Sequence, residues 1–349
     1  MAFASITATG VVTGAGDSAD ALFASVAAGA GGPPPTSRRI EDFDVRRYVD
    51  RRGMKHMSRG SQLACAAAGG VARSLEGVDG RGVGVVYGSA WGCLNTIVRF
   101  ERAAHVDGPR FVDPILFTET VANVPAGQVS IAFGWSALNA TVSAGMASGL
   151  EAIRLAIDLL DDDRASVIVA GGGDETNPHM DRETRGAHGE GACVLAVESD
   201  AHAKRRRAPT LGRLRGAVGC FAGTGDGAKS RCRRALDRLF DRAEIDAGQV
   251  DLVVVPGDLD RSAETAAVVA ARELVGPDRA RWWSPMPGLG ECWAANGPAS
   301  LVLALEAMRR RTLPGDVAGA GPMGLERALV LESSATGHFT ALVAERAGG

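Results

Sequence analysis

Long apolar segments are absent from this sequence of 349 residues. No run reaches the roughly 18 consecutive apolar residues that a membrane-spanning helix needs. The first residues, MAFASITATGVVTGAG, have neither the positively charged start nor the long apolar stretch of a secretion signal. We therefore expect a soluble, cytoplasmic protein that has no membrane partner.

Cysteine pairs and clusters of basic residues are also lacking. The six cysteines form no CxxC pair and no Cys/His ligand spacing, so we expect reduced thiols, no metal and no cofactor. The net charge is −3, and the one local basic run, Lys204–Arg207, stands among polar residues and predicts a solvated loop. We therefore expect no nucleic-acid partner.

The composition that remains is that of a folded globular protein, with 46% hydrophobic and 23% charged residues. Short β-branched runs bounded by glycine predict buried strands at Gly82–Tyr87, Ser166–Ala170 and Leu252–Val255. Apolar residues at three-and-four spacing predict helices at Gln62–Leu75, Ala147–Leu160, Cys232–Arg242, Ser262–Leu274 and Ala299–Arg309. Strands that alternate with helices predict an α/β protein whose sheets lie between helix layers.

The chain divides into two parts with the same pattern. The polar, basic stretch Ser199–Arg213 predicts a connection between an N-terminal half, 1–200, and a C-terminal half, 201–349. Each half carries a strand, a sharp glycine-rich turn and a helix, at Leu138–Ile153 and at Trp283–Leu305. This repetition indicates duplicated α/β halves that form one compact unit.

The first of these turns is a place where an enzyme would carry a nucleophile. A residue there lies at the positive end of a helix dipole, which lowers the pKa of a thiol and stabilises an oxyanion. Here the corner residue is Met146, between Gly145 and Ala147. A thioether cannot form an acyl thioester and cannot transfer a proton. The sequence therefore predicts a nucleophile position without a nucleophile.

An ordered set of motifs around this turn resembles the β-ketoacyl synthase (ketosynthase) family. The motifs are VPAGQVSIAFG at 124–134, the turn TVSAGMASGLEAI at 141–153, AGGGDE at 170–175, HGEGACVLAVE at 188–198 and AANGPA at 294–299, preceded by MKHMSRGSQLACAAA at 54–68. The resemblance covers nearly the whole chain. It implies a thiolase-like fold of five layers, αβαβα, built from two duplicated halves, in which the acidic turn Asp174-Glu175 has a structural role.

The catalytic residues of that family are replaced in this sequence. Its nucleophilic cysteine corresponds to Met146, and its first catalytic histidine, after the strand Leu252–Val255, corresponds to Pro256. Its second histidine corresponds to Glu291, and its lysine to Met286. An anion at Glu291 would repel a malonyl carboxylate rather than stabilise enolate charge. The resemblance therefore implies a degenerate site with no catalytic residues.

The family resemblance also implies residues that shape an acyl tunnel and a subunit interface. Ala335, in the turn Ser334–His338, stands where a gating phenylalanine is usual. Members of the family dimerise through the strand that follows the helix matching Asn123–Ala132, so Trp135–Val142 is the expected pairing strand. The stretch Phe111–Thr120 is expected to reach toward a partner's pocket. The interface and tunnel candidates are Phe111, Ile115, Phe117, Thr118, Asn123 and Ala335.

Three functions agree with these features. The first is a chain-length-factor type of subunit that pairs with an active ketosynthase in type II polyketide or fatty-acyl biosynthesis, shapes the acyl tunnel, and meets an acyl carrier protein through the complex. The second is an acyl transfer or cyclisation that uses Glu291 with Ser143 or Cys292. The third is a homodimeric scaffold that binds acyl chains.

Overall fold

The computed structural model describes residues 3–29, 37–51, 53–54, 57–176, 179, 188–255, 265–315 and 324–348. Within these ranges one ten-stranded sheet has the order β10-β9-β11-β12-β8-β1-β7-β5-β3-β4, and β2 and β6 form a separate two-stranded sheet. The strands are β1 Ala4–Thr13, β2 Ser37–Arg38, β3 Val83–Gly88, β4 Asn139–Val142, β5 Val167–Asp174, β6 His188–Gly189, β7 Gly191–Ser199, β8 Gly212–Phe221, β9 Leu252–Val254, β10 Arg281–Trp283, β11 Arg327–Ser333 and β12 His338–Arg346.

The two halves of the large sheet repeat the same topology. From the centre outward, the order β1-β7-β5-β3-β4 in one half corresponds to β8-β12-β11-β9-β10 in the other. In each half the second strand from the centre, β7 or β12, is antiparallel to both of its neighbours. The two outer pairings of each half are parallel. The duplication that the sequence predicted is therefore a duplication of strand order and strand direction.

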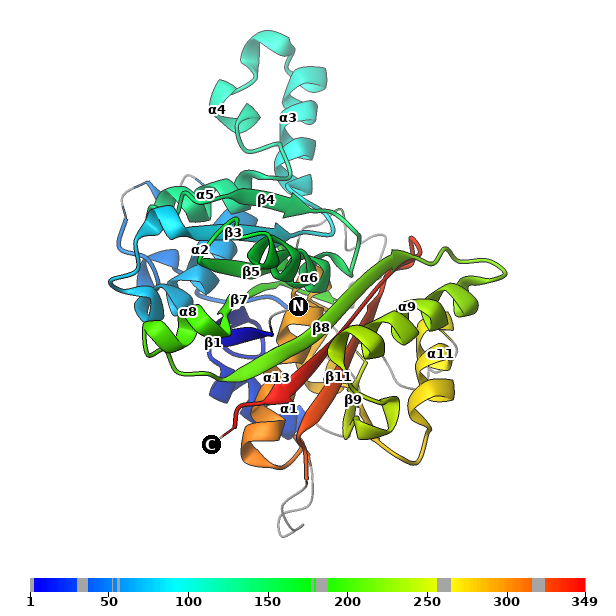
Figure 1. Cartoon of the computed structure of the whole chain (residues 1–349). Helices are drawn as coiled ribbons and strands as arrows, with labels where there is room; N and C mark the ends of the chain where they lie inside the picture. Colours follow the sequence, from blue (N-terminus) through cyan, green and yellow to red (C-terminus); the bar gives the residue numbers. More distant parts are fainter. Residues whose placement is uncertain are drawn as a thin grey trace.

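The helices lie on both sides of the two half-sheets (Figure 1). Their bounds are α1 Ala19–Gly29, α2 Arg59–Ala72, α3 Leu94–Val106, α4 Pro114–Phe117, α5 Val124–Phe133, α6 Ser148–Asp161, α8 Asp200–Arg205, α9 Ala228–Ala243, α11 Ala266–Val275, α12 Met286–Leu289 and α13 Asn296–Arg310. Helices α2 and α5 cover the outer face of one half-sheet, and α9 and α11 cover the outer face of the other. Helices α6 and α13 lie between the half-sheets, so the described chain forms five αβαβα layers.

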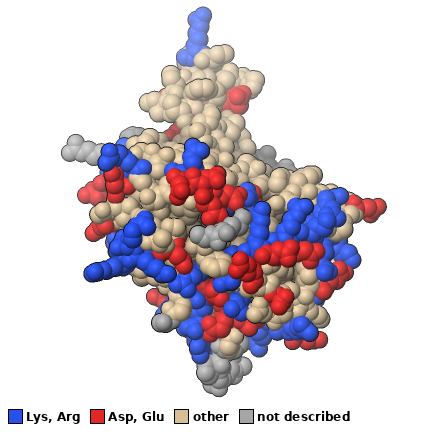
Figure 2. Space-filling model, in the orientation of Figure 1, with Lys and Arg blue, Asp and Glu red and all other residues tan. Residues whose placement is uncertain are grey.

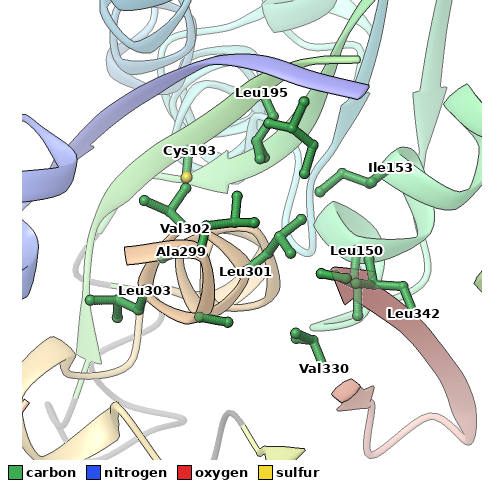
Figure 3. Packing of buried hydrophobic residues seen from close by; sticks show 14 of the residues in the cluster. Leu150, Ile153, Cys193, Leu195, Ala299, Leu301, Val302, Leu303, Val330 and Leu342 are labelled. Atoms are coloured by element: carbon green, nitrogen blue, oxygen red, sulfur yellow. The ribbon is translucent and has the colours of Figure 1, made fainter. Parts of the chain in front are cut away.

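The central layer is the largest hydrophobic core of the molecule. Figure 3 shows side chains of α6, α13 and strands of both half-sheets meeting there, among them Leu150, Leu195, Leu301 and Leu342. All four are at most 1% exposed. Burial of one such side chain contributes about 1.5–3 kcal/mol to the free energy of unfolding. This packing fixes the amino ends of α6 and α13, where the candidate site lies.

The connection between the halves differs from the sequence expectation. Ser199–Arg213 is not one loop, because Ser199 caps the short helix α8 by accepting a hydrogen bond from the His202 N–H. Arg206 is not simply solvated, since its guanidinium binds the buried Glu198 carboxylate. A short polar helix has no apolar periodicity, which explains why the pattern did not predict it. Among the described residues no helix has both the length and the hydrophobicity to cross a membrane.

Candidate functional site

The strand–turn–helix around Met146 has the form that the sequence predicted. Strand β4 ends at Val142, Gly145 takes a left-handed conformation with φ of 61°, and α6 begins at Ser148. The Ser148 hydroxyl fixes the turn by accepting a hydrogen bond from the Ala144 N–H at 2.8 Å and donating one to the Gly145 carbonyl. The partly buried Met146 thus stands two residues before α6.

The turn Ser334–His338 lies directly against this elbow. A Cβ atom at Gly145 would collide with Ser334 Oγ and would lie 3.3 Å from Thr336 Oγ1. Ala335, between them, is exposed and lines a cavity of about 450 Å³ together with Thr224 and Phe339. The structure therefore places the turn that carries Ala335 next to the elbow.

The segment that carries Met286 and Glu291 also reaches the elbow. Met286 begins α12 and is buried, and Glu291 follows Gly290, whose φ is 75°. The Glu291 carboxylate accepts hydrogen bonds from the Trp293 N–H at 2.8 Å and from the Asn296 amide. Burial raises the pKa of Glu291, and these two hydrogen bonds oppose that rise.

Close backbone contacts bring the two helix starts together. A Cβ atom at Gly149, in the first turn of α6, would collide with the Ala294 carbonyl oxygen and lie 2.8 Å from Pro298 Cδ. A Cβ at Gly172 of β5 would lie 2.8 Å from Gly149 Cα. Only glycine allows this packing. The elements that hold Met146 and Glu291 therefore converge, although they come from different halves.

Asp174, at the end of β5, ties these elements together. Its carboxylate accepts hydrogen bonds from Ser89 Oγ and from the N–H groups of Ala90, Trp91 and Ala294 at 3.0–3.1 Å. Burial raises the pKa of Asp174 to about 6, and these donors oppose the rise. All of its bonds go to the scaffold of the chain, which agrees with the structural role that the family resemblance implied. Trp91 packs edge-on against Trp293, with ring centroids 5.2 Å apart.

A second buried carboxyl group was not among the sequence candidates. Glu332 of β11 is 2% exposed, and neither side-chain oxygen has a hydrogen-bond partner in the described structure. A Cβ at Gly297, at the start of α13, would lie 3.0 Å from Glu332 Oε2. Burial raises the pKa of Glu332 well above its usual value, and the nearby Glu291 raises it further. The site thus holds three carboxyl groups, those of Asp174, Glu291 and Glu332, whose pKa burial raises.

The other sequence candidates fall at different places. Cys292 is completely buried, and its Sγ lies 3.8 Å from the Glu190 carbonyl oxygen, whereas Ser143 is exposed beside the elbow. Pro256 lies outside the described residues. Among the residues that the structure describes, no group of three or more His, Cys, Asp or Glu side chains is arranged to hold a metal ion.

The interface candidates form an exposed apolar arm. Helices α3 and α4 project from the body on the side of β4 (Figure 1). Phe111, Ile115 and Phe117 are 75%, 67% and 62% exposed, and Thr118 and Asn123 are also exposed. The Phe117 ring packs at 5.9 Å from Phe100. Phe111, Ile115, Phe117 and Thr118 thus belong to the projecting segment, whereas Asn123 is the N-cap of α5 and Ala335 lies in the turn beside the elbow.

The expected pairing strand is shorter than the sequence suggested. Trp135 is 6% exposed and stacks on Phe133, so it belongs to the core under α5 and not to the strand. Strand β4 begins only at Asn139 and is the last strand of the sheet. A run of apolar residues does not reveal where a helix connection ends and a short edge strand begins.

Comparisons with known proteins agree with this geometry. Residues 49–189 match the family model described as Beta-ketoacyl synthase, N-terminal domain. A putative mitochondrial 3-oxoacyl-(acyl-carrier-protein) synthase of Schizosaccharomyces pombe is 24% identical over 80% of this chain and 75% of its own length. The oxytetracycline polyketide putative beta-ketoacyl synthase 1 of Streptomyces rimosus is 29% identical over 68% of this chain and 65% of its own length.

A solved structure extends the similarity to the whole fold. The ishigamide ketosynthase/chain length factor superposes with a TM-score of 0.85 and 18% identity, over 99% of this chain and 100% of that chain. At this identity the match shows the fold alone. The chain therefore has the mixed α/β fold of thiolase-like ketosynthase structures, and its residues 49–189 are similar to the N-terminal domain of beta-ketoacyl synthases.

Proposed function

We propose that this chain is a non-condensing ketosynthase-like subunit of the chain-length-factor type. The observation that carries the proposal is Met146 at the elbow before α6, in a turn that is otherwise intact. Condensation in this family needs a thiolate that becomes acylated, and a thioether sulfur has no proton to lose and cannot hold an acyl group. An elbow that keeps its geometry but lacks the thiol is suited to binding and shaping rather than to condensation.

The residues around Met146 support the same proposal. Glu291 stands at the position of a catalytic histidine, with its carboxyl group engaged by Trp293 and Asn296. Burial raises the pKa of Glu291, and the hydrogen bonds from Trp293 and Asn296 already occupy its carboxylate. Met286, at the lysine position, offers no charge. None of these groups replaces the proton transfer and charge stabilisation that the family's histidines and lysine supply.

The free edge of the sheet supports pairing with a partner. The backbone N–H groups of Val85 and Ser89 donate hydrogen bonds to the carbonyls of Leu138 and Val142. Because alternate residues of a strand direct their backbone groups to opposite sides, the N–H and C=O groups of Asn139 and Thr141 face away from β3. An exposed edge with unpaired N–H and C=O groups is a template for a strand of another chain. Pairing there would continue the sheet across two subunits.

The apolar arm supports the choice of an active ketosynthase as that partner. Helices α3 and α4 project on the side of β4, and exposed apolar side chains such as Phe111, Ile115 and Phe117 on this arm are typical of an interaction site. In the proposed heterodimer the arm reaches the partner's pocket and limits the depth of the acyl tunnel. The carrier protein delivers its acyl chain to the active partner, in type II polyketide or fatty-acyl biosynthesis, in the cytoplasm.

The names of similar proteins are in line with this role. One is described as a polyketide β-ketoacyl synthase, one as a synthase that acts on an acyl-carrier-protein thioester, and one as a ketosynthase/chain length factor. The last description joins a ketosynthase to the kind of subunit that we propose. Complete burial of Cys292 argues against the alternative of acyl transfer through that thiol. Ser143 is exposed, so an acyl transfer that uses its hydroxyl group would be seen as turnover of an acyl thioester by this chain alone.

Replacing Thr141 by proline tests the pairing directly. Proline removes the outward N–H of β4 but no hydrogen bond to β3, so the subunit should fold, since edge strands tolerate proline on the free side. We expect Thr141→Pro to lose co-purification with the ketosynthase encoded beside it, while Thr141→Val retains it. Native mass spectrometry distinguishes the heterodimer from a homodimer. A homodimer that ignores the ketosynthase would contradict the proposal and favour an acyl-binding scaffold.

A further inference from the structure

Strand β8 has a second free edge, away from β4. β8 runs from Gly212 to Phe221, but its neighbour β1 pairs only with Gly212–Leu214. Beyond that point β8 continues between α6 and α9 with β12 alone beside it (Figure 1). Gly219 and Phe221 are exposed, and Phe221 is 65% exposed.

The backbone groups at this edge can be assigned from the hydrogen bonds nearby. The Ala222 N–H donates to the Gly337 carbonyl at 2.8 Å, and the Ser334 N–H donates to the His338 carbonyl. In an antiparallel ladder, alternate residues face opposite sides. The register of β8 with β12 therefore directs the N–H and C=O groups of Gly219 and Phe221 away from β12, toward the open side.

One wall of this edge is a row of arginines on α9. Arg231, Arg234, Arg238 and Arg242 recur at helical spacing and line a cavity of about 340 Å³ along Val218–Phe221. Arg231 donates to the Ala222 carbonyl. Arg234, Arg238 and Arg242 are exposed, and no hydrogen bond or ion pair holds them within the described structure. Figure 2 shows Lys and Arg side chains gathered over α9.

On the opposite wall, formed by α6, one arginine is matched by two carboxylates. Arg154 lines the same cavity, but it pairs with Glu151 at 2.7 Å and with Asp158 at 2.5 Å. A Cβ at Gly219 would collide with Glu151 Oε2 of α6, so Gly219 and Phe221 have their side-chain positions on the α6 face of β8. The alternate residues Val218 and Cys220 pack on the α9 face. The positive charge of the groove is thus on the α9 side alone.

We propose that this groove, formed by the edge 217–221 of β8 and the arginines of α9, binds an extended acidic peptide segment of a partner protein. The segment adds a strand to β8 and forms hydrogen bonds with Gly219 and Phe221, which gives affinity through the main chain. Its side chains alternate between the two walls. Acidic residues at every second position meet Arg234, Arg238 and Arg242, and uncharged residues between them face α6.

Two peptides that have the same amino-acid composition but a different residue order test this proposal. The probe is a fluorescein-labelled hexapeptide of alternating Glu and Thr, and the comparison peptide has the three Glu residues before the three Thr residues. Both carry the same charge, but only the first places every Glu on one face of a strand. By fluorescence anisotropy with the whole chain, we expect the alternating peptide to bind about tenfold more tightly.

Two pairs of variants assign the contacts. Arg234→Gln combined with Arg238→Gln should weaken the alternating peptide about tenfold, because two ion pairs of roughly 0.5–1 kcal/mol each are lost. Arg233→Gln, on the same helix but paired with Asp237, should leave it unchanged. Phe221→Pro removes an edge N–H and should abolish binding, whereas Phe221→Ala should retain most of it.

Other outcomes overturn the proposal. Equal binding of the two peptides would show that charge alone is recognised, without strand pairing. Competition by inorganic triphosphate at lower concentration than the peptide, lost in the double arginine variant, would make the groove a phosphate site. No binding of the alternating peptide at millimolar concentration, while circular dichroism shows an intact fold, would also exclude it.

Discussion

The Asp174 carboxylate accepts a hydrogen bond from the Ala294 N–H at 3.1 Å and so joins the end of β5 to the segment before α13. The two residues belong to different halves of the chain, and the same carboxylate holds Ala90 and Trp91 after β3. One buried side chain therefore fixes three segments around the degenerate site.

Replacing Asp174 by asparagine should destabilise the whole molecule. The amide has only one accepting oxygen, so its NH2 group would face backbone N–H donors in a buried place. We expect a loss of about 3 kcal/mol in the free energy of unfolding, measured by urea denaturation. Asp162→Asn, at the exposed end of α6, is the matched control and should change stability by less than about 0.5 kcal/mol. Equal stability of both variants would show that Asp174 is not a structural tie.

A cysteine at position 146 should not restore condensation. In Met146→Cys the new thiol lies before the positive end of α6, which lowers its pKa, so we expect faster alkylation by iodoacetamide than in Ser143→Cys. Turnover of acyl and malonyl thioesters should stay at the level of the unmodified chain, because Glu291 and Met286 remain. Mass spectrometry of the protein and chromatography of the products measure the two effects. Condensation well above background would show that Met146 alone silences the site.

Glu332 should make stability depend on pH. Burial raises its pKa in the folded state, so between the unfolded pKa near 4.5 and the folded pKa the folded protein binds more protons than the unfolded one. The free energy of unfolding therefore falls as pH rises through this window, by up to about 1.4 kcal/mol per pH unit for this group. Glu332→Gln cannot ionise and should show a smaller fall in Tm between pH 5 and pH 8. The exposed Glu76→Gln is the control and should follow the unmodified chain.

Phe117 should limit product length if the arm reaches into the partner's tunnel. Its side chain is 62% exposed in the single chain, so Phe117→Ala costs little folding stability but removes a ring from the proposed tunnel end. In a reconstituted system we expect longer carrier-bound products, measured by mass spectrometry. Phe221→Ala, which removes a similarly exposed ring at the end of β8 and outside the arm, should leave the product distribution unchanged. Identical distributions for all three proteins would contradict the tunnel role.

The sequence pattern predicted the strand, turn and helix around Met146, because neighbouring residues determine them. The period of apolar residues changes from two to about four across Leu138–Ile153, and the structure has the expected strand, turn and helix there. The buried state of Glu332 could not be predicted, since one acidic residue in the apolar run of β11 does not reveal which face it takes. The helix α8 was missed because it is short and polar, although Ser199 followed by Asp200 is a capping signal.

Features that depend on contacts between residues far apart in the chain could not be predicted from the sequence either. The free edge of β8 exists because the pairing with β1 stops at Ala4, opposite Leu214, and the residues of β8 alone do not indicate where that pairing stops. Trp293 takes a left-handed conformation, with φ of 55°, directly before Ala294, whose carbonyl oxygen packs closely on Gly149 of the other half. Such properties arise from how two halves meet rather than from the propensity of a segment.

The most direct test of a non-condensing partner subunit is reconstitution with the neighbouring ketosynthase. This chain, untagged, is co-expressed with the tagged ketosynthase, and carrier-bound products are assayed with and without it. We predict a one-to-one heterodimer whose chain extension depends on this subunit, while this chain alone releases no product from acyl thioesters. A ketosynthase that elongates equally well without it, or an isolated chain that turns over acyl thioesters, would contradict the account.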